Sequence, residues 1–297
     1  MIAEDIKTEQ KKAARKTVSI LALSAVFFAM VLAVGIISVS HSAGTVSVKS
    51  YGTAKVSVPN FLAVFALATL FFLGLIYFLK VKKIKRAIFK IMFFLSVFAG
   101  TTIFFNVWAG QLFAFSAGVL AAVAWWTYPK VASHNLCLVF AMLGAGIFLG
   151  HVFSPDAAAF LLLFFSVYDL AAVYVTKHMI VMAKEMIANG ALAAVFIPMN
   201  FSGLKESINR IAAGGEKFLV LGGGDIIFPL FFCVSVTRYY GIVASAITAL
   251  FATIGFCASF YQFLNQGTRR PIPALPPIAL FTLIGYALAI FLINNLT

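Results

Sequence analysis

Charged side chains are scarce in this chain. Asp, Glu, Lys and Arg make up only 10% of its 297 residues, whereas 63% are hydrophobic. The mean hydropathy is +1.04, and a water-soluble domain of this length needs more polar side chains than that to cover its surface. A soluble fold is therefore excluded, and the composition indicates a membrane protein.

Several signatures of catalytic and metal chemistry are also missing. The three cysteines show no CxxC spacing, the four histidines form no HExxH pair, and no GxSxG sequence occurs; these seven residues are Cys137, Cys233, Cys257, His41, His134, His151 and His178. A zinc metalloprotease and a serine hydrolase are thus disfavoured. We expect no metal and no cofactor, and we expect the cysteines to serve in packing.

Long apolar runs dominate the chain. A helix that crosses about 30 Å of hydrocarbon needs about 20 apolar residues. This criterion predicts an all-α bundle of nine transmembrane helices, at residues 18–39, 61–79, 87–107, 112–129, 136–153, 157–176, 218–237, 241–263 and 273–293. The first run could also be a cleaved signal peptide, but it exceeds the usual apolar core of about 7 to 15 residues, so we expect a retained helix.

The basic residues predict the orientation. If the N-terminus is cytosolic, all but three of the 22 Lys and Arg residues fall on the cytosolic side, and the exceptions are Lys49, Lys55 and Arg238. Basic residues are retained on that side during insertion, so we expect a cytosolic N-terminus and a C-terminus outside. The same bias explains the net charge of +13 without a nucleic-acid partner.

The predicted topology depends on residues 186–201, because this segment could form a tenth span. That span would be short, would carry Pro198, Asn189 and Asn200, and would weaken the charge bias. We therefore interpret the segment as a surface-lying or partly disordered part of a connection. The chain then divides into a cytosolic tail (1–17), six helices (18–176), a cytosolic connection (177–217) and three more helices (218–297).

Two of the nine acids lie inside predicted helices, namely Asp169 and Asp225. An acid near mid-helix costs about 2.5 to 3.5 kcal/mol on insertion scales, so such acids usually face the bundle interior and serve a function. Asp169 precedes Lys177 by eight residues, and Asp225 follows Lys217 by eight. At about 1.5 Å per residue, both acids would lie about 12 Å from the cytosolic boundary.

Consecutive antiparallel helices could bring these level acids together. Two close carboxyl groups in a low dielectric cannot both ionise easily, so the pair would share one proton. Electrostatically this is an aspartic-protease dyad, in which one carboxylate activates water and the protonated partner polarises a carbonyl.

Two further motifs lie near these acids. Gly222, Gly223 and Gly224 precede Asp225 and either let a substrate backbone approach or pack two helices closely. The sequence RRPIPALPPIAL, residues 269–280, either begins a helix or leaves backbone groups free to pair with an extended peptide. Gly146 and Gly150 form a GxxxG pair that predicts a helix contact, and Trp108, Trp125 and Trp126 lie near span ends.

At three motifs the chain resembles the presenilin and signal peptide peptidase family of intramembrane aspartyl proteases. The family carries YD on helix six, GxGD on helix seven and PAL at helix nine. These motifs match Tyr168 and Asp169, Gly222 to Asp225, and Pro273, Ala274 and Leu275. The resemblance implies that Asp169 and Asp225 are catalytic and that the PAL residues dock the substrate. We expect Tyr168 and the three glycines to contact the substrate as well.

The stretches SVYDLAAV and PALP look like those of the presenilin branch. The chain resembles a compact microbial or archaeal presenilin homologue, which we expect in the cell membrane of a prokaryote. The expected substrates are transmembrane helices of single-span membrane proteins, and membrane lipid surrounds the bundle. The variable position of the GxGD motif is usually Leu in presenilins and is Gly223 here. We expect this difference to affect where the enzyme cleaves and not whether it is catalytic. Association with further copies of the chain, or with partner subunits, stays open.

A transporter or cation pore is the alternative reading of Asp169 and Asp225, which would then carry protons or cations. The two acids lie on adjacent helices and not in matching positions of two inverted halves. The residues by themselves therefore favour a protease only modestly, and the resemblance strengthens that preference.

Overall fold

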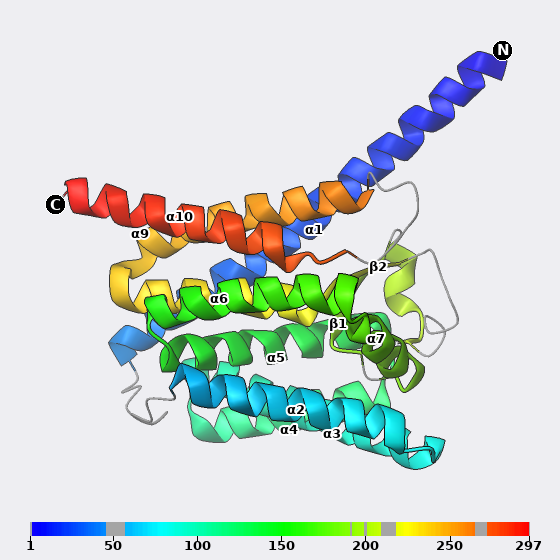
Figure 1. Cartoon of the computed structure of the whole chain (residues 1–297), viewed down its shortest axis with the longest axis horizontal. Helices are drawn as coiled ribbons and strands as arrows, with labels where there is room; N and C mark the ends of the chain where they lie inside the picture. The colour runs from blue at the N-terminus through cyan, green and yellow to red at the C-terminus, as the bar shows by residue number, and fades with distance from the viewer. Residues whose placement is uncertain are drawn as a thin grey trace.

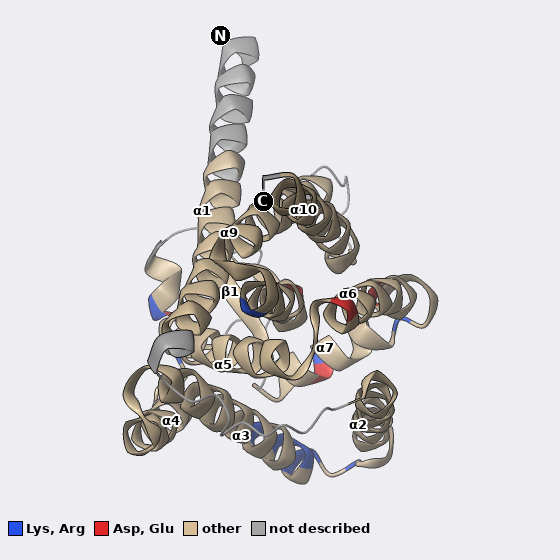
Figure 2. Ribbon diagram, turned by 90° about the vertical axis from the view of Figure 1, so that its left-hand side faces the viewer, with Lys and Arg blue, Asp and Glu red and all other residues tan. Residues whose placement is uncertain are grey.

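The computed structural model of the chain describes residues 2–45, 57–190, 192–198, 201–208, 218–264 and 272–296. Most helices within these ranges run roughly along one direction (Figure 1) and are seen nearly end-on after a quarter turn (Figure 2). Four basic residues that entered the charge count, Arg210, Lys217, Arg269 and Arg270, lie outside the described residues, as do Lys49 and Lys55.

The first six expected spans are all helices, namely α1 (Ile2–Thr45), α2 (Val58–Phe78), α3 (Lys82–Ala109), α4 (Gln111–Thr127), α5 (Val131–Val152) and α6 (Pro155–Leu170). Local signals explain where α6 begins, because the Ser154 hydroxyl accepts a hydrogen bond from the Ala157 N–H and Pro155 occupies the first turn. After Leu170 the chain continues as a π-helix, η2 (Ala171–Val175).

The last three spans come from α9 (Gly223–Leu264) and α10 (Leu275–Leu296). Helix α9 is broken at Gly241, whose φ of 84° and ψ of 177° are not helical, so it contains two spans. Among the described residues seven helices are long and apolar enough to cross a membrane, with α9 counted once, and α4 is a shorter apolar helix. The predicted membrane bundle of nine helices is confirmed.

The connection between α6 and α9 departs from two expectations. It contains α7 (His178–Ala188), a short 3-10 helix η3 (Phe201–Lys205), and a two-stranded antiparallel sheet of β1 (Ala194–Pro198) and β2 (Phe218–Gly222). The expected helix at 218–237 is wrong at its start, because Phe218–Gly222 form a strand. The surface-lying interpretation of 186–201 is also wrong, since Ala194, Val195, Phe196 and Ile197 are buried.

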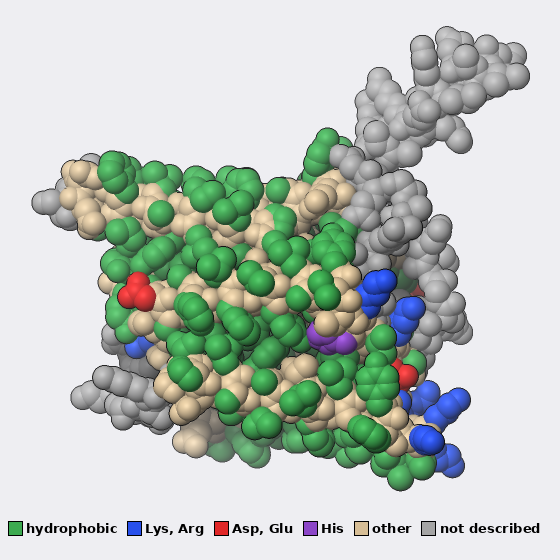
Figure 3. Space-filling view, viewed as in Figure 1, with side chains coloured by type: hydrophobic (Ala, Val, Ile, Leu, Met, Phe, Trp, Pro, Cys, Tyr) green, Lys and Arg blue, Asp and Glu red, His purple; other side chains and the backbone are tan. Residues whose placement is uncertain are grey.

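Helix α9 lies at the centre of the packing, in contact with α1, α5, α6 and α10, whereas α3 packs on α4 and α5. Hydrophobic side chains cover the visible face of the bundle (Figure 3), as a surface in contact with lipid requires. Most Lys and Arg side chains in that view gather at the end of the bundle where α7 and the two strands lie. This basic end also holds the candidate active site described next.

Candidate active site

Asp169 is the next-to-last residue of α6 and is buried, with 7% of its surface exposed. Its carboxylate Oδ2 accepts a hydrogen bond from the backbone N–H of Leu275, at 3.3 Å. Directly after it the helix widens into η2, where one extra residue enters the turn. Such π-turns often lie at functional sites, because they displace the neighbouring backbone.

Asp225 is the third residue of α9, so it lies in the first turn of that helix, directly after β2. Its side chain is half-buried and folds back toward the end of the strand, where the backbone N–H of Gly222 bonds to it. Each of the two acids is therefore held by a backbone N–H from a separate motif.

The two carboxyl groups lie close enough to interact electrostatically, since α6 packs on α9. One step of the expected geometry changes, however. The depth of about 12 Å for Asp225 assumed a helical rise from Lys217 onward, and a strand rises by about 3.3 Å per residue instead. Counting helical residues therefore does not support the expected equal depth of the two acids, which stays a prediction.

The three glycines before Asp225 have different surroundings. A Cβ atom on Gly223 would lie 2.8 Å from the Ala193 carbonyl oxygen, and one on Gly222 would lie 2.9 Å from the Asp225 carboxylate. Gly224 is exposed and would meet only the Phe228 ring, at 3.4 Å. Close packing therefore explains Gly222 and Gly223, and of the three only Gly224 leaves room for an approaching chain.

The PAL residues lead into α10. Pro273 and Ala274 are not helical, and Leu275 begins the helix. The Ala274 carbonyl accepts a hydrogen bond from the Ser259 hydroxyl at 2.9 Å, and the Leu275 N–H donates to Asp169. The protein itself thus occupies these two backbone groups. One of the two alternatives for this segment was that its backbone groups are free to pair with a peptide, and that alternative does not hold for these two groups.

Tyr168 connects the site to neighbouring elements. Its hydroxyl lies 2.8 Å from Nε2 of His178, at the start of α7, and it also bonds to the Thr69 side chain of α2. The Nδ1 of His178 lies beside the Thr176 hydroxyl. Burial lowers the pKa of His178 below its ordinary value of 6.5, so the neutral ring is favoured here.

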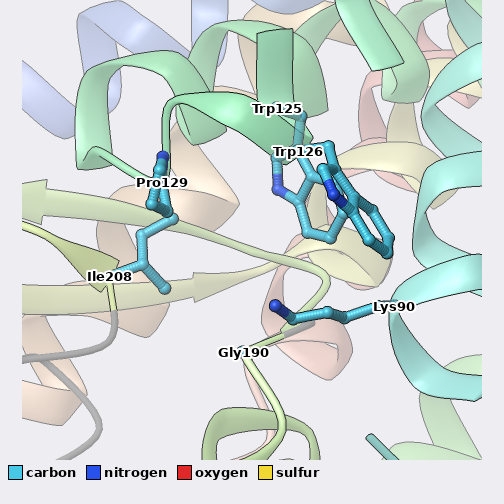
Figure 4. A pocket seen from close by; sticks show the side chains of 6 residues that line it. All are labelled: Lys90, Trp125, Trp126, Pro129, Gly190 and Ile208. Atoms are coloured by element: carbon cyan, nitrogen blue, oxygen red, sulfur yellow. The ribbon is translucent and has the colours of Figure 1, made fainter. Parts of the chain in front are cut away.

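A separate small hollow, partly open at the surface, lies beside the end of α4. Its lining residues are Lys90, Trp125, Trp126, Pro129, Gly190 and Ile208, and Figure 4 shows the Lys90 side chain extending beneath the two indole rings. None of the predicted site residues lines it. Within the described ranges no three His, Cys, Asp or Glu side chains cluster as metal ligands would.

Sequence reasoning missed three polar residues near the site, namely His134, Asn135 and Ser259. His134 and Asn135 bind strand β1 from the beginning of α5, and Ser259 holds the PAL backbone. None of them forms a recognisable motif. The available signal was an adjacent His and Asn near the start of an otherwise apolar predicted helix.

A family model described as signal-peptide peptidase, presenilin aspartyl protease matches residues 6–294. The chain belongs to this family. It is therefore an intramembrane aspartyl protease, a hydrolase, and an integral multi-pass membrane protein. No sequence among the curated proteins matches it.

Two solved structures of a presenilin family intramembrane aspartate protease share the fold. The one in space group C222 has a TM-score of 0.62 at 17% identity and covers 92% of this chain and 99% of its own. The one in space group P2 has a TM-score of 0.54 at 21% identity and covers 92% of this chain and 96% of its own. Family membership decides between a protease and a transporter, in favour of the protease.

Proposed function

We propose that the chain hydrolyses peptide bonds within transmembrane helices of single-span membrane proteins, and that Asp169 and Asp225 form the catalytic dyad. The observation that carries this proposal is that Asp169, at the end of α6, and Asp225, in the first turn of α9, lie on two helices that pack on each other, with each carboxyl group held by a backbone N–H. An ion pathway would need no such pair of backbone anchors, whereas general acid and base catalysis requires fixed carboxyl groups.

The dyad works with one proton. The ionised carboxylate removes a proton from water as the water oxygen bonds to the peptide carbonyl carbon, and the protonated carboxyl gives its proton to the carbonyl oxygen. The tetrahedral intermediate then breaks its C–N bond. The nitrogen takes the proton from the first acid, and the second carboxylate recovers a proton from a hydroxyl, which leaves an amine end and a carboxylic acid end.

Strand β2 offers an edge to an unwound substrate. The N–H and C=O of Phe196 face Asn135, so those of its partner Val220 face the opposite edge of the sheet. Among the described residues none forms a hydrogen bond to Val220 at that edge, and Val220 is 48% exposed. A peptide that adds a strand there would pass close to Asp225, because β2 leads directly into α9.

We place the site on the cytosolic side of the membrane. The basic end of the bundle (Figure 3) supports this orientation, because Lys and Arg are retained in the cytosol. A helical substrate must unwind there before cleavage, since helical hydrogen bonds occupy its carbonyl groups. The cut would therefore fall in the cytosolic part of the substrate helix, near helix-breaking residues.

The test is incubation of the purified protein in lipid nanodiscs with a single-span substrate, followed by mass spectrometry of the fragments. We expect cuts inside the apolar segment, toward its cytosolic end. Cuts only in the outer half would contradict the orientation, and the absence of any cut over a panel of single-span substrates would contradict the proposed substrate class.

A further inference from the structure

The beginning of α5 binds strand β1 through two polar side chains. Asn135 donates from Nδ2 to the Phe196 carbonyl at 2.7 Å and accepts the Phe196 N–H on Oδ1 at 3.0 Å. Its neighbour His134 lies with Nε2 at 3.1 Å from the Ala194 carbonyl. Three outward-facing backbone groups of β1 are therefore fixed by α5.

The hydrogen bond from Trp125 determines which ring nitrogen of His134 carries the proton. The indole N–H of Trp125 donates to Nδ1 of His134 at 3.0 Å, so Nδ1 carries the lone pair. The proton must then be on Nε2, which donates it to Ala194. His134 is fully buried and its ring stacks on Phe93, with centroids 5.3 Å apart, so the imidazole has little freedom to turn.

The contact on β1 continues to the site through the sheet. Ala194 pairs with Gly222, and Val195 pairs with Leu221. The Gly223 N–H then donates to the Ala193 carbonyl at 2.9 Å, which extends the sheet to within two residues of Asp225. Strand β1 is buried along most of its length, whereas β2 is largely half-buried or exposed, so the position of β2 depends on β1.

We propose that His134 and Asn135 are positioning residues for peptide cleavage, because they fix β1 and thereby set where β2 presents a substrate to Asp225. This inference rests on the proposed function, since it concerns the same site. It assigns a role to polar side chains that touch neither acid. A displaced β2 would move the scissile bond relative to the dyad, and small displacements of reacting groups are costly in rate.

The test compares Asn135→Ala with the gentler Asn135→Asp, which keeps the acceptor for the Phe196 N–H and loses the donor. We expect Asn135→Ala to lower kcat on the order of tenfold to a hundredfold per folded molecule and to shift the cleavage position along the substrate. Faster hydrogen exchange at the Leu219, Leu221 and Gly223 amides should accompany these changes. Asn135→Asp should show the same changes to a smaller degree, and it carries the test if Asn135→Ala does not fold.

His134 supplies a second pair of variants. His134→Phe keeps an aromatic ring against Phe93 and removes both hydrogen bonds, whereas His134→Gln can restore a donor toward Ala194 and should recover part of the activity. The matched controls are His151→Gln, at the other end of α5, and Asn295→Ala, at the end of α10, each of which bonds only to its own helix through the side chain. Both should cut at the wild-type positions.

Unchanged cleavage positions and rates per folded molecule in Asn135→Ala and His134→Phe would overturn the inference, and so would unchanged exchange in β2. A wild-type protein that cuts nothing would instead refute the proposed function. The exchange measurement would then decide by itself whether α5 controls the position of β2.

Discussion

Helices α3, α4 and α5 run without interruption and pack closely on one another, whereas every element that carries a predicted site residue is irregular near that residue. Gly144 of α5 lies against Gly100 of α3, and a Cβ atom on Gly144 would come within 2.6 Å of the Gly100 carbonyl carbon. Small residues let regular helices approach in this way, because their backbone hydrogen bonds are already satisfied within each helix.

The site region is built differently. Helix α6 ends in a π-turn, α9 begins from a strand, and α10 begins after the non-helical Pro273 and Ala274. Backbone groups released at these points are bound by side chains, as when Ser259 binds Ala274 and Asp169 binds Leu275. Irregular backbone inside a membrane is tolerated only where the protein satisfies it. Helices α3, α4 and α5 thus form a packing region, whereas the site region holds irregular backbone whose polar groups are bound by side chains.

The largest expected effect is the loss of activity in Asp169→Asn and in Asp225→Asn. Asn keeps the shape and an acceptor oxygen but cannot exchange the proton, so each variant should lose on the order of 10²- to 10⁴-fold in cleavage rate. The melting temperature in detergent should stay equal or rise, because one of two crowded carboxyl groups is gone. Near wild-type cleavage by either variant would refute the dyad, and failure of both to fold would make the acids structural.

Ser259→Ala should have an intermediate effect. The change leaves the Ala274 carbonyl without its hydroxyl partner, at a cost of about 1 to 3 kcal/mol in unfolding free energy. It should also reduce kcat/KM by about tenfold, since the chain that follows Ala274 orients Asp169. Kinetics on one substrate, with Thr248→Val as the control on the same helix, checks this. Thr248 bonds only to Ala244 within its own helix, so an equal loss in that control would argue against a special role of Ser259.

Gly144→Ala should reverse the pattern, with a clear loss of stability and little change in chemistry. The added methyl group would push α5 away from α3 and cost about 1 to 3 kcal/mol. The cleavage rate per folded molecule should stay within about twofold of wild type, because such overpacking acts on the folded fraction. Thermal unfolding together with active-site titration measures both quantities. A large loss of cleavage rate without a loss of unfolding free energy would contradict the distinction between the two regions.

The smallest expected effect concerns pH. Burial lowers the pKa of His178 in the folded protein below 6.5, so the unfolded chain binds a proton more readily. The stability that the neutral ring contributes is present above pH 6.5 and is lost as the pH falls from that value through the lower pKa of the folded protein. In His178→Gln the melting temperature should therefore fall less between pH 7.5 and pH 5.5 than in wild type. An equal fall in both proteins would show that His178 does not contribute, and the effect should be small because the ring is only half-buried.

Much of the scaffold could be predicted from the amino-acid pattern. Apolar runs of sufficient length located the nine membrane helices, since a bilayer demands about 20 such residues per span. The scarcity of acids isolated Asp169 and Asp225, because a carboxyl group in a span is costly and rarely incidental. The strand at Phe218–Gly222 was missed, because a short apolar run next to a helix has no periodicity that tells strand from helix.

What the sequence by itself determined is which residues enter the membrane and which polar groups enter with them, because transfer free energy is a property of each segment. The tertiary structure alone decided how those polar groups are satisfied. Leu275 reaches Asp169 across 106 positions of the chain, and Asn135 reaches Phe196 across 61. Such bonds depend on the relative placement of distant helices and strands, which local residue patterns do not encode.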